Sequence, residues 1–154
     1  MINDIIEKTK LHLNRAKSAR SEIKNWPNGL DCELFEDFEK IKTIDTFIYR
    51  FIKLQDMMGE KLFKFFLDEL GEYNDTMSLL DVLDKLEKFE IIGDASKWME
   101  YRKLRNKLTH EYPNNEDEVI EGIHIAIDVF SDIEQILKNI EQYVEKSIKN
   151  KGNH

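Results

Sequence analysis

Apolar side chains recur at steps of three and four residues along most of the chain, which is the spacing of one face of an α-helix. The first such stretch covers residues 2–24, and its repeating side consists of Ile2, Ile5/Ile6, Thr9, Leu13, Ala16 and Ile23. The segment Trp26-Pro27-Asn28-Gly29 ends it, because proline cannot continue the hydrogen-bond ladder and Asn-Gly favours a turn. His12 lies off the apolar side, so we expect it on the surface.

A second and longer helical stretch is predicted between Cys32 and Leu70. Its repeating positions are Leu34, Phe38, Ile41, Asp45, Ile48, Ile52, Gln55, Gly59, Leu62, Phe66 and Leu70. Burial of an unpaired carboxylate is costly, so two interpretations arise. Either the helix is rotated so that Asp45 and Gln55 reach solvent, or these two residues and Arg50 flank a functional site. Gly59 is typical of a kink or a close contact between helices.

Three shorter patterns follow a loop at residues 71–75. We expect a third helix over about 79–89, a fourth from 95 to 109 or 111, and a fifth from about 115 to 146, with a frayed tail from about 147. The apolar side of the fifth helix consists of Val119, Ile123, Ala126, Phe130, Ile133, Leu137, Ile140 and Val144. Asp94 or Ser96 is placed to cap the fourth helix, whose packing side is Trp98, Leu104 and Leu108. No strand-like alternation occurs. The sequence therefore predicts a single all-α domain over residues 1–154, an antiparallel up-and-down bundle of four to five helices.

Composition and charge narrow the function classes. The formal net charge of −8 argues against broad, non-specific coating of nucleic acid, which needs many cations. The single cysteine, Cys32, excludes an intrachain disulfide and a cysteine-based zinc cluster. The N-terminal residues lack the pattern of a signal peptide, and no apolar run reaches membrane-spanning length. We expect a cytoplasmic protein with no membrane partner, no metal and no cofactor.

A local excess of positive charge lies in the predicted fourth helix. Five lysines and arginines occur between Lys97 and Lys107, against one acid, Glu100. Helical spacing places Arg102 and Arg105 on one face. His110 is five steps from Arg105, which is not a stacking interval, so both can reach one ligand only if the helix loosens before the proline at position 113.

The residue types in this segment suit chemistry on phosphates. Arginine is a permanently charged fork that matches phosphate oxygens, and histidine exchanges protons near neutral pH. Arg105 and His110, with the polar Asn106 beside them, are sufficient for metal-independent phosphodiester transfer. A base takes the proton of a ribose 2′-hydroxyl while a cation stabilises the negative charge that develops at phosphorus. The structural alternative is a histidine that only stabilises the C-terminal end of a helix.

The same residues carry a family resemblance. The octet Arg105 to Tyr112 matches the R-x4-H-x-Y motif of the HepT-like toxins in the HEPN superfamily, and the likeness extends over residues 79–113. The resemblance implies a helical bundle that forms a homodimer and brings two motifs together in one cleft. It also implies a metal-independent endoribonuclease, in which Arg105 and His110 are the catalytic pair and Asn106 supports them. We assign Arg102 and Lys107 to RNA or phosphate contact.

The resemblance further implies a toxin–antitoxin module. The partner in the R-x4-H-x-Y group is a minimal nucleotidyltransferase antitoxin, which transfers AMP to the motif tyrosine, here Tyr112. A bulky anion there would compete with RNA phosphate for Arg105. Two further hypotheses stay open. One is a non-catalytic, nucleotide-binding subunit that serves as the substrate-binding part of a nucleotidyltransferase, and the other is a helical adaptor that does not need Arg105 or His110.

Overall fold

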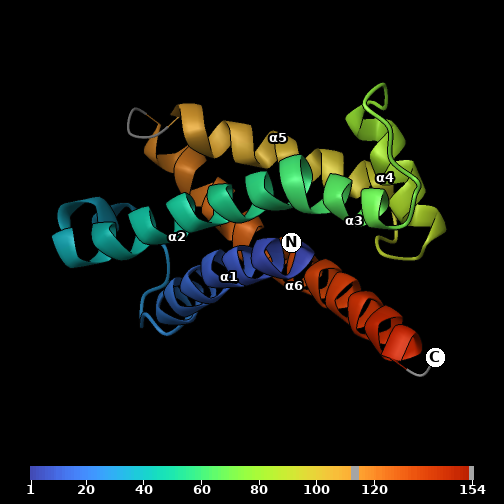
Figure 1. The fold of residues 1–154 in the computed structure, drawn as a ribbon. Coiled ribbons are helices and arrows are strands. Elements are labelled where there is room, and N and C mark those ends of the chain that lie inside the picture. The colour runs from blue at the N-terminus through green and yellow to red at the C-terminus, as the bar shows by residue number, and fades with distance from the viewer. Residues whose placement is uncertain (112–114, 153–154) are drawn as a thin grey trace.

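The computed structural model describes residues 1–111 and 115–152, with side chains described up to 109 and again from 115 to 147. Within these ranges the chain is helical without strands, as expected. The elements are α1 (Ile2–Lys24), the 3-10 helix η1 (Cys32–Glu36), α2 (Phe38–Asp56), the π-helical η2 (Met57–Leu62), α3 (Phe63–Glu69), α4 (Leu79–Lys88), α5 (Ala95–Glu111) and α6 (Glu116–Gly152). α2 contacts α1 on one side and α5 on the other, and α6 contacts both α5 and α1 behind them (Figure 1).

Helices α1 and α6 bury the sides that the sequence predicts. In α1 the buried positions include Ile2, Ile6, Thr9, Leu13, Ala16 and Ile23. In α6 they include Val119, Ile123, Ala126, Phe130, Ile133, Leu137 and Ile140. The α6 helix continues to Gly152, past position 147 where we expected the ordered part to end. Among the described residues, no helix is long and apolar enough to cross a membrane.

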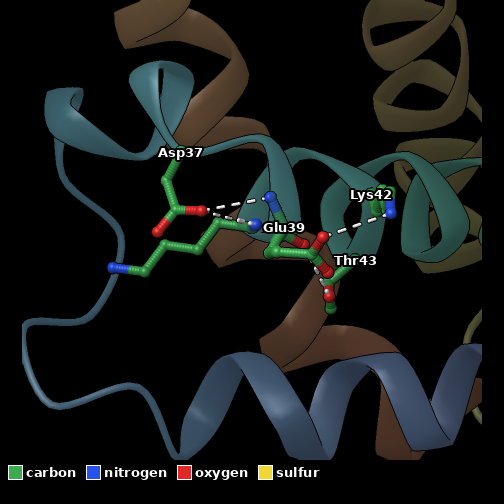
Figure 2. A network of polar contacts seen from close by, with 5 residues as sticks. Asp37, Glu39, Lys42 and Thr43 are labelled. Carbon is green, nitrogen blue, oxygen red and sulfur yellow. Dashed lines mark hydrogen bonds and ion pairs between the residues drawn. The ribbon is translucent and has the colours of Figure 1, made fainter.

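The start of α2 is fixed by a side-chain cap. The Asp37 carboxylate accepts hydrogen bonds from the backbone N–H groups of Glu39 and Lys40, at 3.1 and 3.4 Å, which satisfies donors that the first turn of a helix leaves unpaired. Figure 2 shows this cap together with the Lys42–Glu39 ion pair and the Thr43 hydroxyl, which donates to the Glu39 carbonyl.

The predicted core side of α2 is wrong over most of the helix. Phe38 is 67 % exposed and Asp45 is also exposed. The buried positions are instead Thr43, Ile44, Phe47, Phe51 and Leu54, and of the predicted side only Gln55 is buried in α2. The reason is packing, because the Phe47 ring lies against those of Phe51 and Phe130, with centroids 5.8 and 6.5 Å apart, and buried aromatic pairs contribute more than the smaller side chains opposite them. The interpretation that Asp45 reaches solvent is confirmed, whereas the same expectation for Gln55 is wrong.

A π-helical turn at Gly59 joins α2 to α3. A Cβ at Gly59 would lie 3.6 Å from Nε1 of Trp98, so α5 passes close to this turn, which confirms the expected close contact. The Trp98 ring in turn packs edge-on against Phe63, with centroids 4.8 Å apart. The extra residue of the π turn shifts the helical register, so that Leu62, Phe63 and Phe66 continue the buried side.

Helix α4 begins with a reciprocal cap. The Ser78 hydroxyl accepts from the Asp81 backbone N–H at 3.1 Å, and the Asp81 carboxylate accepts from the Ser78 N–H at 3.0 Å. At the following helix, Asp94 accepts from the Ser96 N–H at 2.9 Å, which confirms one of the two expected caps.

The reciprocal cap predicts the effect of Ser78→Ala. Because the substitution leaves an N-terminal donor unpaired, we expect the free energy of unfolding to fall by about 1 kcal/mol, measured by chemical denaturation followed by circular dichroism. Ser131→Ala is the matched control, since Ser131 is an exposed position inside α6 and should change stability by less than about 0.5 kcal/mol. Equal stability of the two variants would contradict the capping role.

Candidate functional site

A cleft of about 210 Å³ lies where α5 passes the junction of α2 and η2. The residues that line it are Gln55, Asp56, Gly59, Glu60, Lys64, Leu79, Trp98, Arg102, Arg105 and Asn106. The sequence-predicted residues Arg102, Arg105 and Asn106 thus face one cleft. Gln55 and Gly59 from the polar positions of the second helix also line it, whereas Asp45 and Arg50 do not.

Arg105 is held in the cleft by two carboxylate bonds. Its Nε donates to Oδ1 of Asp56 at 3.0 Å and its Nη2 donates to Oδ2 at 2.8 Å. Nη1 donates to the side-chain oxygen of Asn106 at 3.1 Å. The hydrogen bond to Asp56 raises the pKa of Arg105, and the charges of Asp56 and Glu60 act in the same direction. The guanidinium is therefore a fixed cation whose plane is set by its two partners.

The remaining donors of Arg105 decide what it can bind. A guanidinium carries five N–H groups, and the bonds to Asp56 and Asn106 occupy three of them. The two that remain, one on Nη1 and one on Nη2, have no partner among the described residues. Guanidinium N–H groups suit the oxygens of a phosphate or carboxylate, so an anion can contact Arg105 without displacing Asp56.

A chain of polar bonds fixes α5 behind this arginine. The buried Gln55 donates from Nε2 to the Tyr101 carbonyl at 3.0 Å. The Tyr101 hydroxyl donates to Asp132 of α6 at 2.8 Å. Burial and this hydrogen bond raise the pKa of Tyr101 far above its ordinary value, so the phenol stays a donor at neutral pH. The bonds from Gln55 of α2 and to Asp132 of α6 therefore resist rotation of α5 about its axis.

Close packing of α5 on α6 completes the support. A Cβ at Gly122 of α6 would lie 2.9 Å from Cδ2 of Leu108, closer than such atoms approach in proteins, so glycine permits this approach. Leu104 and Leu108 are both buried here, as the sequence predicts. With this side of α5 against α6, Arg102 and Arg105 line the cleft.

The structure does not place the other expected site residues, Lys107, His110 and Tyr112, in the cleft. Lys107 does not line the cleft. His110 lies in α5, which remains helical through Glu111. We expected the backbone to loosen at His110, and this expectation is wrong. The side chain of His110 and the whole of Tyr112 lie outside the described residues.

Asp56 is the site residue that the sequence analysis missed. It is polar and follows Gln55 in a stretch that is otherwise apolar from Phe51 to Met58 apart from Lys53. That interruption was the available signal. Its partner is 49 residues away along the chain, so no local spacing could pair the two.

Fold and site together define a helical bundle in which an arginine of α5 lines a cleft beside α2 and η2. No family model and no solved structure matches the chain. The chain is 35% identical over 63 residues to a protein described as "Probable ribonuclease HepT" from Haemophilus influenzae. The match covers 41% of this chain and 38% of that relative, so it spans well under half of the relative's length. This similarity agrees with the resemblance to HepT-like proteins that the sequence motif indicates.

The geometry predicts a specific result for Asp56→Asn. The substitution keeps the size of the side chain and removes its charge, so the order parameter of the Arg105 Nε–H bond, measured by NMR relaxation, should fall to below about 0.6. The free energy of unfolding should fall by less than about 1 kcal/mol, since partly exposed ion pairs contribute little. Glu39→Gln, which breaks the exposed pair with Lys42, is the control. An equally ordered Arg105 in Asp56→Asn would show that Asp56 does not hold it.

Proposed function

We propose that this protein is the endoribonuclease toxin of a toxin–antitoxin module, and that it cleaves RNA without a metal ion. The observation that carries the proposal is the similarity to a probable ribonuclease HepT, in a chain whose motif arginine stands in a cleft and keeps two N–H donors without a partner among the described residues. A fixed guanidinium in a partly buried cleft is suited to stabilising charge that develops on a phosphate.

The reaction assigns one role to each motif residue. His110 accepts the proton of the ribose 2′-hydroxyl, and the 2′-oxygen attacks the adjacent phosphorus. The bond from phosphorus to the 5′-oxygen breaks, and that oxygen takes up a proton. The products are a 2′,3′-cyclic phosphate and a 5′-hydroxyl. Arg105 binds the non-bridging oxygens, and Asn106 keeps the guanidinium in plane. Arg102, which lines the same cleft, contacts a neighbouring phosphate, and we assign Lys107 to the backbone of the RNA outside it.

Helix geometry favours a site made from two copies of the chain. Because α5 is regular to Glu111, positions 105 and 110 are about 140° apart around its axis at 3.6 residues per turn. One copy therefore does not aim both positions at the same phosphate. In a two-fold homodimer, Arg105 of one copy and His110 of the other share one groove. The pairing also doubles the local positive charge in a chain of net charge −8.

The antitoxin in this proposal is a minimal nucleotidyltransferase that transfers AMP to Tyr112. Arg105 and Tyr112 are seven positions apart in the sequence. In this proposal the phosphate of the AMP on Tyr112 competes with the RNA phosphate for Arg105. Inhibition then requires no change in fold.

The proposed activity predicts that the purified protein cuts single-stranded RNA in the presence of EDTA and leaves 2′,3′-cyclic phosphate ends. His110→Ala and Arg105→Ala should each lower the cleavage rate by at least about a hundredfold, because each removes acid–base or electrostatic stabilisation. The control is Lys10→Ala, which breaks an ion pair with Glu141 far from α5 in sequence and should cleave normally. Cleavage by His110→Ala at the normal rate would remove His110 from the mechanism.

A growth assay separates the toxin from the nucleotide-binding alternative. Two arginines in the cleft suit the phosphates of a nucleotide as well as those of RNA, which is why the alternative is retained. Expression of the chain alone should arrest growth, and coexpression of the nucleotidyltransferase should restore it together with a gain of AMP on Tyr112 by mass spectrometry. Tyr112→Phe should stay toxic in the presence of the antitoxin. Normal growth with intact, soluble protein would favour the non-catalytic subunit.

A further inference from the structure

A second group of cations lies at the junction of α1 and α2, and the cleft does not include it. Nη1 of Arg50 lies 3.0 Å from Nδ1 of His12. The Arg50 guanidinium lies 5.2 Å from the ring centroid of Tyr49, and Nζ of Lys53 lies 5.7 Å from it. Tyr49 is nevertheless 53 % exposed. Arg15 of α1 acts on the same histidine as Arg50 and Lys53. We call Tyr49, Arg50 and Lys53 of α2, together with Arg15, the α2 strip.

The cations of the α2 strip differ from others on the same helices. Lys10 and Lys17 of α1 form ion pairs with Glu141 and Glu134 of α6, at 3.4 and 2.8 Å. In the part of the chain with described side chains, no carboxylate lies within ion-pair distance of Arg15, Arg50 or Lys53. Among the described residues, these three cations therefore have no partner of opposite charge, although the chain as a whole is acidic.

The pKa of His12 shows that the electrostatic potential at the α2 strip is positive. It is partly buried, contrary to the expectation of a surface residue. Burial lowers the pKa of His12, and Arg50, Lys53 and Arg15 lower it further. A neutral imidazole accepts the hydrogen bond from Arg50 at neutral pH. His12 therefore orients Arg50 without adding a charge.

The α2 strip leads toward Arg105. Positions 49, 53 and 56 follow each other at steps of four and three, which places them on one side of α2. Tyr49 and Asp56 are about 10 Å apart along the helix axis at 1.5 Å per residue, and Asp56 binds Arg105. α2 lies between α1 and α5 (Figure 1), so the outer side of α2 connects the two positions. Asp45, exposed one turn before Tyr49, bounds the strip at the other end.

We propose that the α2 strip is a binding subsite for single-stranded nucleic acid, in which a base stacks on Tyr49 or on the guanidinium over it while Arg15, Arg50 and Lys53 contact phosphates. The inference rests on the proposed function in that the natural strand is the RNA substrate. An exposed ring needs an unstacked base, which a single strand offers and a duplex does not.

The test measures binding separately from cleavage. The probe is a fluorescein-labelled oligo(dU), which lacks the attacking 2′-hydroxyl, and the readout is fluorescence anisotropy at low salt. Tyr49→Ala should weaken binding by about five- to a hundredfold, the loss expected of one stacked base. Tyr49→Trp should restore it. Lys53→Ala should weaken binding and make it less dependent on salt.

The chain offers a matched control. Phe38 is 67 % exposed and carries Lys42 over its ring at 4.8 Å, so it has the same local chemistry at the far end of α2. Phe38→Ala should leave binding unchanged. Equal effects of Phe38→Ala and Tyr49→Ala, or a duplex that binds as tightly as the single strand, would overturn the subsite.

The outcomes separate this inference from the proposed function. If RNA is cleaved, Tyr49→Ala should raise KM and leave kcat unchanged. Cleavage with binding and KM unaffected by Tyr49→Ala would refute the subsite and leave the ribonuclease proposal intact. Weakened binding by Tyr49→Ala in a protein that never cleaves RNA would support the subsite and refute the ribonuclease.

Discussion

The bidentate bond between Arg105 and Asp56 determines how the candidate site is arranged. The two side chains are about a quarter exposed, at 26 and 29 %, so their ion pair contributes little to stability. Its effect is geometric, because two parallel bonds fix both the position and the plane of the guanidinium. The neighbouring bonds from Gln55 to Tyr101 and from Tyr101 to Asp132 extend the same constraint from α2 through α5 to α6. The position of Arg105 is thus fixed relative to α2, α5 and α6.

Local spacing predicted most of the fold because most helices have one apolar side. The bounds of α1 and the buried side of α6 follow directly from steps of three and four. α2 is different, because it has an apolar series on each of two sides and its sequence does not say which faces the core. Phe130, far along the chain, decides between them by packing against Phe47. Sequence periodicity therefore identified the helix and not its rotation.

The same limit applies to the site. Arg102, Arg105 and Asn106 share a cleft because they lie on one short helical segment, and spacing alone groups them. Asp56 reaches Arg105 only when α2 and α5 pack together, through contacts such as that of Gly59 with Trp98. The basic character of α5 is therefore balanced in the folded protein by Asp56 and Glu60 from the opposite wall. A count of charges along one helix overstates the positive potential of the cleft.

If the protein binds RNA as we propose, this balance separates two tasks that such a site has to perform. The strip cations lack carboxylate partners among the described residues, so they attract a phosphate chain over the range of a Debye length, about 8–10 Å at moderate salt. Arg105 is partly neutralised by Asp56, so it attracts weakly at a distance and is specific in contact, through the two N–H groups that have no partner among the described residues. Attraction and orientation consequently depend on residues of different helices, the strip on α1 and α2 and Arg105 on α5. Interactions that are equal in the ground state and the transition state affect KM, and interactions gained only at the transition state affect kcat. The positions of Tyr49 and Asp56, two turns apart on α2, assign the first effect to the strip and the second to the cleft.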